Sequence, residues 1–424
     1  MNCILLAVFG TLIFFYSKGM RLAGIYSKSD QRLIFLANVI CYLLLFAVFA
    51  FCSSRVRFLF KNNYARIIIL SYCATVIPNI LSAYMLYSQP LMGVIRTFFW
   101  YGGWAFLLAL ILWGPDVDLA LRLVHVFVFF GVVAAILGCL AVLFPSIRVA
   151  LIAEEAVSER FELTRINILT QAVQFAFYFC LVSLCNSRFG RAKSIMPVTG
   201  LVVTSVSIFF ISISRQAIIA TCIVLLYFTI KYLRKQMRIQ YLLIVLGILV
   251  LFFVAGGFDI VEQSLSSAYE GDPGDVHNVD IRLEGIRFFW NQLRDTNYIG
   301  TGKISTVHGG RNIILDAREE DKIYWVDVGI LGTVGMYGFP AVLLVVVAFW
   351  KSFRDINLIK RHSISPFMTT IAVAIELFLI AGILQFGRSM FYELSAYHYS
   401  FIFFVLWVFS TATRHQLRSG KVLS

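Results

Sequence analysis

Apolar runs of about 20 residues recur along almost the whole of this 424-residue chain. A helix needs roughly 20 apolar residues to cross the hydrocarbon of a bilayer. The runs are continuous rather than alternating, which excludes a β-barrel and leaves helices as the structure whose backbone is satisfied in lipid. A soluble protein cannot bury a composition that is 60% hydrophobic and only 14% charged. The sequence therefore predicts an all-α, polytopic membrane helix bundle.

Run lengths predict about twelve transmembrane helices. We expect helices with short loops over 1–256, one large, partly helical extracytoplasmic loop over 257–325, and further helices with a cytoplasmic tail over 326–424. The predicted spans are 2–17, 33–52, 67–87, 91–113, 119–144, 166–185, 196–213, 216–230, 241–258, 326–350, 366–386 and 397–412.

The net charge of +13 resides in short basic clusters between apolar runs, and no nucleic-acid-binding motif accompanies it. By the positive-inside rule, four clusters mark cytoplasmic loops and the tail. They are Arg188, Arg191 and Lys193; Lys231, Arg234, Lys235 and Arg238; Lys351, Arg354, Lys360 and Arg361; and Arg414, Arg418 and Lys421. Alternation places both termini in the cytoplasm and 145–165, the turn at 212–216 and the long loop outside. The basic loop at 18–32 disagrees, so either it is an exception or the first-quarter count is wrong by one.

Twelve of the 23 acidic residues lie in the polar segment 257–325, which is too long for a passive connector. Helical spacing predicts a helix there, with Asp280 as its cap and a turn at Gly300 and Gly302. Its expected apolar face comprises Leu283, Ile286, Phe289 or Trp290, and Leu293, and its other face Arg287, Asn291 and Arg294. The outer segment 145–165 mixes charged and apolar residues and is interpreted as an interfacial amphipathic helix.

Three residues at the predicted outer membrane boundary could carry chemistry. Arg215 lies in a short Ser-Arg turn between two apolar runs, where a guanidinium binds a phosphate bidentately or reaches toward lipid headgroups. Arg282 opens the loop helix and either binds an anion or pairs with a nearby acid. Asp327 lies where the chain re-enters the membrane, as a general base, a sugar ligand or a helix cap.

Other charged residues have less specific positions. Arg96 and Arg388 lie near the outer side and could join an anion site with Arg215, whereas the loop cations taken singly are also typical of surface charges. Glu376 lies near the middle of its span and must face protein, in a structural pair or a transport pathway. No metal-ligand spacing or nucleotide-binding motif is present, so we expect neither a metal nor a cofactor.

The order of elements from about 200 to 345 resembles the O-antigen polymerase and O-antigen ligase superfamily, including exopolysaccharide repeat-unit polymerases. The resemblance rests on the Ser-Arg turn, the basic linker, the loop helix with Arg282 and Trp290, the Gly-x-Gly turn, and the re-entry helix from Trp325. Many members begin that re-entry helix with His-Asn, whereas this chain has Asp327 followed by Val328. That departure favours a polymerase over a ligase.

The resemblance implies a metal-independent, GT-C-like glycosyltransferase in the bacterial inner membrane, with the long loop in the periplasm. It would polymerise undecaprenyl-diphosphate-linked repeat units, which serve as donor and acceptor, with a chain-length regulator protein as a candidate partner. Arg215 and Arg282 would bind the diphosphate, and Asp327 or Glu284 would deprotonate the acceptor. The candidate substrate-binding residues are Arg96, Arg287, Trp290, Lys303, Arg311 and Arg388.

Two alternatives stay open at this point. A transporter or flippase for the same lipid-linked glycan would use charges at the membrane midplane, and Glu376 is the feature in its favour. A ligase of the same superfamily would require a lipid A–core acceptor.

Overall fold

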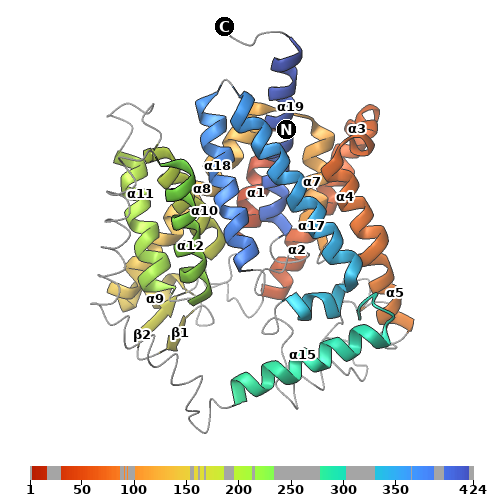
Figure 1. Ribbon diagram of the computed structural model, residues 1–424, viewed down its shortest axis with the longest axis horizontal. Coiled ribbons are helices and arrows are strands. Elements are labelled where there is room, and N and C mark those ends of the chain that lie inside the picture. The colour runs from red at the N-terminus through yellow and green to blue at the C-terminus, as the bar shows by residue number, and fades with distance from the viewer. Residues whose placement is uncertain are drawn as a thin grey trace.

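The computed structural model shows an almost entirely helical protein (Figure 1). It describes residues 2–16, 30–85, 90, 93, 101–152, 157–160, 163–166, 169–185, 195–212, 215–233, 277–301, 330–363, 365–385 and 396–419. The elements up to residue 151 are α1 (Asn2–Tyr16), α2 (Asp30–Phe51), η2 (Ser53–Arg55), α3 (Val56–Lys61), α4 (Asn63–Ser71), η3 (Tyr72–Val76), α5 (Ile77–Met85), α7 (Gly102–Trp113), α8 (Val117–Leu143) and α9 (Pro145–Leu151). The later elements are β1 (Val157–Arg160), β2 (Leu163–Ile166), α10 (Thr170–Cys185), α11 (Ile195–Val206), η7 (Ser207–Ile211), α12 (Arg215–Tyr232), α15 (His277–Asp295), α17 (Ile330–His362), α18 (Pro366–Leu384) and α19 (Ala396–Arg418).

Five described helices are long and apolar enough to cross a membrane, which supports a membrane protein. They are Asn63–Met85, Val117–Leu143, Leu331–His362, Pro366–Leu384 and Ala396–Arg418. Six shorter apolar helices coincide with six other predicted spans, while the predicted span 241–258 lies outside the described residues. The count of twelve spans therefore stays a prediction.

The elements sort to two ends of the bundle (Figure 1). α9, β1, β2 and α15 lie at the bottom of the view, and we call this the α15 end. At the top, α19 ends, and the Asn2 amide at the start of α1 donates to Asp116 at the start of α8, with 2.8 Å between Nδ2 and Oδ2. The described parts of two segments predicted to be extracytoplasmic, 145–165 and 257–325, thus lie at one end, and the described end of the predicted cytoplasmic tail lies at the other.

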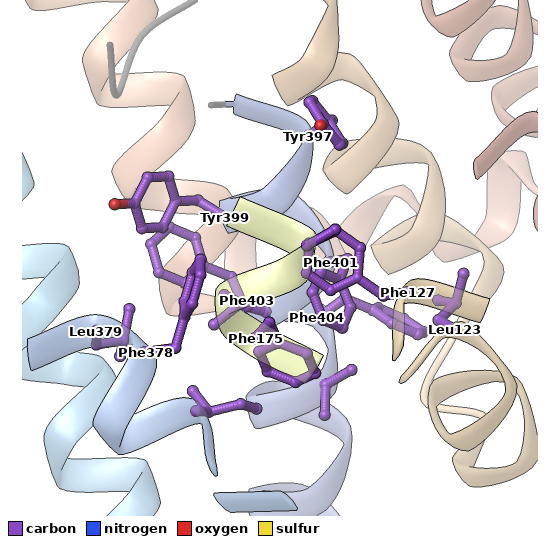
Figure 2. Close-up of a cluster of buried hydrophobic side chains, with 14 of the residues drawn as sticks. Leu123, Phe127, Phe175, Phe378, Leu379, Tyr397, Tyr399, Phe401, Phe403 and Phe404 are labelled. Carbon is purple, nitrogen blue, oxygen red and sulfur yellow. The ribbon is translucent and has the colours of Figure 1, made fainter. Parts of the chain in front are cut away.

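α19 forms the centre of the bundle, where it packs against α7, α8 and α17. The centroid of its Phe401 ring lies 4.7 Å from the ring centroid of Phe127 in α8 and 5.5 Å from that of Phe175 in α10. The Phe175 ring in turn makes an edge-to-face contact with Phe378 in α18, with 5.7 Å between the ring centroids (Figure 2). Tilted and edge-to-face contacts of this kind are the favoured aromatic geometries, and they join four helices around one core.

Two predictions about local structure are wrong. The segment 145–165 is helical only up to Leu151, and β1 then pairs antiparallel with β2. Pairing satisfies backbone groups that an extended chain would leave open, and it buries Ile166 against α8 and η7. The basic stretch after residue 350 is not a loop, because α17 continues to His362 with Ile356 and Ile359 fully buried. The buried residues continue at helical spacing, so packing stabilises the helix through this stretch.

Candidate functional site

The α15 end is organised by α15, an amphipathic helix of 19 residues that crosses the end of the bundle (Figure 1). Phe289 and Leu293 are each 1% exposed, and α15 packs on α17. The predicted helix inside the polar segment is therefore confirmed. Two details were wrong. The helix begins at His277, so Asp280 lies inside it rather than at its cap, and Leu283 is 49% exposed rather than on the packed face.

A turn after α15 fastens it to α17 through the backbone. The Thr301 amide donates to the Gly335 carbonyl at 3.0 Å, and the Phe339 amide donates to the Tyr298 carbonyl at 3.2 Å. Within the turn, the Gly300 amide donates to the Thr296 hydroxyl at 3.1 Å. The turn is thus held from both sides, which confirms the predicted turn at Gly300, while Gly302 lies beyond the described part of the loop.

The fastening requires a glycine at a break in α17. Gly338 interrupts this helix with φ 77° and ψ 174°, in a region that residues with a Cβ rarely adopt. A Cβ on Gly338 would lie 2.2 Å from the Ile299 carbonyl oxygen, so a side chain would collide with the docked turn. Conformation and close approach therefore both select glycine at this position.

The outward side of α15 carries polar and aromatic side chains that no other described element covers. Glu284, Arg287, Asn291 and Arg294 are exposed, and Trp290 is 47% exposed. None of the ion pairs among the described residues involves Glu284, Arg287 or Arg294. This side therefore offers guanidinium groups and an indole to solvent and to any ligand.

Arg282 occupies a different register of α15. It precedes Phe289 by seven residues, which is about two turns and brings its backbone position to within roughly 20° of that residue around the helix axis. Glu284 precedes Phe289 by five residues, about 140° around the helix, in agreement with its exposure. By register, Arg282 thus belongs to the bundle-facing side and Glu284 to the outward side. The side chain of Arg282 lies outside the described part of the structure.

Arg215 is the first residue of α12. The preceding helix loosens into the π-helical turn η7, a form that recurs at functional sites, and η7 packs against β2 of the hairpin. Arg215 therefore begins its helix at the end of the bundle where the hairpin and α15 also lie. A helix start exposes free amide groups that favour anions. The structure describes the backbone of Arg215 but not its side chain.

The other candidate residues from the sequence fall outside the described residues. They are Arg96, Lys303, Arg311, Asp327 and Arg388. Their proposed roles stay predictions. In the described part of the chain, no group of three or more His, Cys, Asp or Glu residues is arranged to hold a metal.

The buried carboxylates lie away from the α15 end. Glu376, 3% exposed on α18, accepts from Lys231 Nζ at 2.8 Å and from Lys360 Nζ at 2.6 Å. The Tyr227 and Tyr232 hydroxyls also donate to it, at 2.6 and 2.5 Å. The prediction that Glu376 faces protein is confirmed, and of its two proposed roles the structure provides the charge pair.

A second carboxylate of this kind was not singled out from the sequence. Asp355 on α17 pairs with Lys351 and with Arg414 Nη2 of α19 at 3.0 Å, and the Tyr64 hydroxyl of α4 donates to it at 3.1 Å. The spacing of Lys351 and Asp355, four residues apart, was the available signal. It was missed because the stretch was interpreted as a basic loop.

A third carboxylate, Asp116, lies between α7 and α8. It accepts from the Leu119 amide at 3.1 Å, and the Trp113 indole donates to the Asn2 side chain beside it at 2.7 Å. Partial burial opposes its ionisation, but the hydrogen bonds from Leu119 and Asn2 outweigh this and lower the pKa of Asp116 below its usual value. We call the region of Asp355 and Glu376 the charge-paired end.

Comparison of the sequence with models of protein families and with curated proteins finds no match.

Proposed function

We propose that the protein is a membrane glycosyltransferase that polymerises lipid-linked oligosaccharide repeat units, with undecaprenyl diphosphate as the carrier. The α15 end would be the catalytic end and would face the outside of a bacterial cytoplasmic membrane. The donor and the acceptor would both be lipid-linked glycans, and no metal would be needed.

One observation carries the proposal. The polar segment that the sequence selects for chemistry contains a helix fastened to the end of the bundle, at the end where α12 begins with Arg215. Arg282 shares the register of the packed residues of that helix, unlike the exposed Arg287 and Arg294. A cationic site at the boundary between apolar helices and a polar cap suits a lipid diphosphate, which has an apolar tail, an anionic centre and a sugar head.

The chemistry would be a substitution at the anomeric carbon of the donor. The acceptor hydroxyl oxygen attacks this carbon, the bond from it to the phosphate oxygen breaks, and the electron pair leaves with undecaprenyl diphosphate. Arg215 and Arg282 would stabilise the charge that develops on the leaving diphosphate. A carboxylate would take the proton of the hydroxyl. The outward position of Glu284 favours Asp327 for that role.

The test replaces Arg215 or Arg282 by Ala in the full-length protein. Purified variants in liposomes receive undecaprenyl-diphosphate-linked repeat units, and product length is read on a gel. Removing one positioned guanidinium should lower the rate by about 10² to 10³. Arg294→Ala is the matched control, because it removes an exposed arginine of the same helix that lies outside the proposed substrate-binding set, and it should leave elongation at saturating donor unchanged. Normal chain lengths from well-folded Arg215→Ala and Arg282→Ala proteins would refute the proposed roles.

The transporter alternative loses its main support, because Glu376 has lysine partners that give it a structural reason to be buried. The same liposomes separate the alternatives. Elongated glycans indicate a polymerase, and translocation without elongation indicates a transporter. Product formation that requires a lipid A–core acceptor indicates a ligase.

A further inference from the structure

We infer that Glu376 is a positioning residue, which sets the orientation of α12 and thereby that of Arg215 at the other end of the same helix. The inference rests on the proposed function, because it assigns a task to Glu376 through the diphosphate-binding arginine.

The contacts of Glu376 concentrate on the end of α12. Three of its hydrogen-bonding partners, Tyr227, Lys231 and Tyr232, lie in the last two turns of that helix. Lys360 of α17 completes the set and also donates to the Tyr232 hydroxyl at 2.7 Å. The Glu376 carboxylate on α18 therefore contacts residues on two sides of the last turns of α12. Through Lys360 it also links α12 to α17.

Packing joins α12 to the helix that carries Glu376. Among the described elements, α12 packs chiefly against α18, with a smaller contact to η7. The helix has 18 residues, so it spans about 26 Å and transmits a rotation from one end to the other. Arg215 lies about 160° around the helix from Lys231, so Glu376 can act on it only through the helix itself.

The hydrogen-bond geometry explains why a carboxylate suits this task. A carboxylate offers about four acceptor positions, and the four side-chain donors to Glu376 fill them, two on each oxygen. An amide in its place would offer one acceptor oxygen and leave two lysines without a counter-charge. The four bonds together fix the rotation and the height of α12 more closely than apolar packing alone.

The experiment measures the rate of elongation per donor concentration for Glu376→Gln, Arg215→Lys and the double variant in liposomes. Misplacing a binding group by about 1 Å can cost about 10²-fold, so we expect each single variant to be at least ten-fold slower. If Glu376 acts through Arg215, the double variant should be no slower than the slower single variant. Multiplied losses would overturn the inference and leave the proposed function standing. Wild-type elongation by Arg215→Lys and also by Arg215→Ala would instead overturn the proposed function.

Two further variants separate positioning from general stability. Asp355→Asn breaks a buried carboxylate cluster that does not include α12, so its loss should multiply with that of Arg215→Lys. The triple variant Glu376→Leu, Lys231→Met, Lys360→Met replaces the charges by apolar side chains, which commonly preserves folding where a single charge removal does not. It lacks the four hydrogen bonds to the carboxylate, so the folded triple variant should still elongate at least ten-fold slower than the wild type. Wild-type elongation by the triple variant would overturn the inference, because α12 would then be positioned without the carboxylate.

Discussion

The two ends of the bundle treat charge in opposite ways. At the charge-paired end, Asp355 and Glu376 are almost fully buried, and each has two cationic partners and at least one tyrosine. At the α15 end, Glu284, Arg287 and Arg294 are exposed and take part in none of the ion pairs of the described chain. A charge buried among membrane helices requires a partner, whereas a charge in water keeps its binding capacity. The paired charges therefore build the protein, and the exposed ones are available to a ligand.

At the charge-paired end, the largest change in stability should come from Asp355. Asp355→Asn should destabilise the protein by about 3–5 kcal/mol, because Lys351 and Arg414 lose their counter-charge. The measurement is thermal unfolding of the purified protein in detergent. Arg414→Ala is the control and should cost only about 1 kcal/mol, since the Arg414 side chain is 49% exposed. Equal losses from the two variants would show that burial does not set the strength of this cluster.

At the α15 end, the docking of the turn on α17 is tested at Gly338. Gly338→Ala should cost at least about 1–2 kcal/mol from the positive φ alone, and the collision with the Ile299 carbonyl should loosen the turn after α15. Limited proteolysis should then cleave near residues 296–301 faster, and elongation should fall. Gly138→Ala is the control, since its Cβ would meet Ile211 at an ordinary 3.6 Å. Unchanged proteolysis of Gly338→Ala would contradict the docking described above.

Substitution of Asp116 should have a smaller effect on stability, and that effect should depend on pH. Asp116→Ala removes the cap of α8 and should cost about 1 kcal/mol at neutral pH, whereas Asp116→Asn keeps a capping side chain. The pKa of Asp116 is lowered in the folded protein, so its carboxylate contributes fully above an unfolded pKa of about 3.9. That contribution is lost as the pH falls through the lowered folded pKa. Stability curves between about pH 5 and pH 2 should therefore drop more steeply for the wild type than for Asp116→Asn.

The smallest effect on stability should come from the outward side of α15. Arg287→Ala and Trp290→Ala should change the free energy of unfolding by less than about 0.5 kcal/mol, because both side chains are exposed. Elongation assays should nevertheless show a several-fold higher KM for the lipid-linked donor, since an exposed indole and guanidinium suit a sugar chain. Phe289→Ala, on the packed side, should cost several kcal/mol instead. An unchanged KM for both outward variants would remove them from the substrate-binding set.

The hydropathy of a helix did not predict how much of it is buried in the bundle. Of the five membrane-length helices, α8 has the most apolar stretch, and 33% of that stretch is buried, whereas α19 has the least apolar stretch, of which 83% is buried. Lipid is as apolar as a leucine side chain, so the helices that face it need the most apolar residues. A central helix can carry Ser400 and His398, because protein surrounds it. The order of apolar runs therefore predicted which segments are helical but not which one forms the centre.

At the α15 end, too, part of the structure could be predicted from the sequence and part could not. Periodicity in the polar segment predicted the helix and its outward polar residues, because 3.6-residue spacing is a local property of the chain. It could not choose between Phe289 and Trp290 for the packed face or foresee that Leu283 stays exposed, since that depends on where α17 presents Gly335 and Gly338.

By itself, the sequence determined a helical membrane protein with one polar segment and a helix inside it, because run length, composition and periodicity act locally. The tertiary structure alone decided that Glu376 meets lysines 16 and 145 residues away, and that Asp355 meets an arginine 59 residues away. It also decided that the backbone at Gly338 receives the turn after α15. These contacts join residues far apart in the chain, so their geometry is set by how the helices pack.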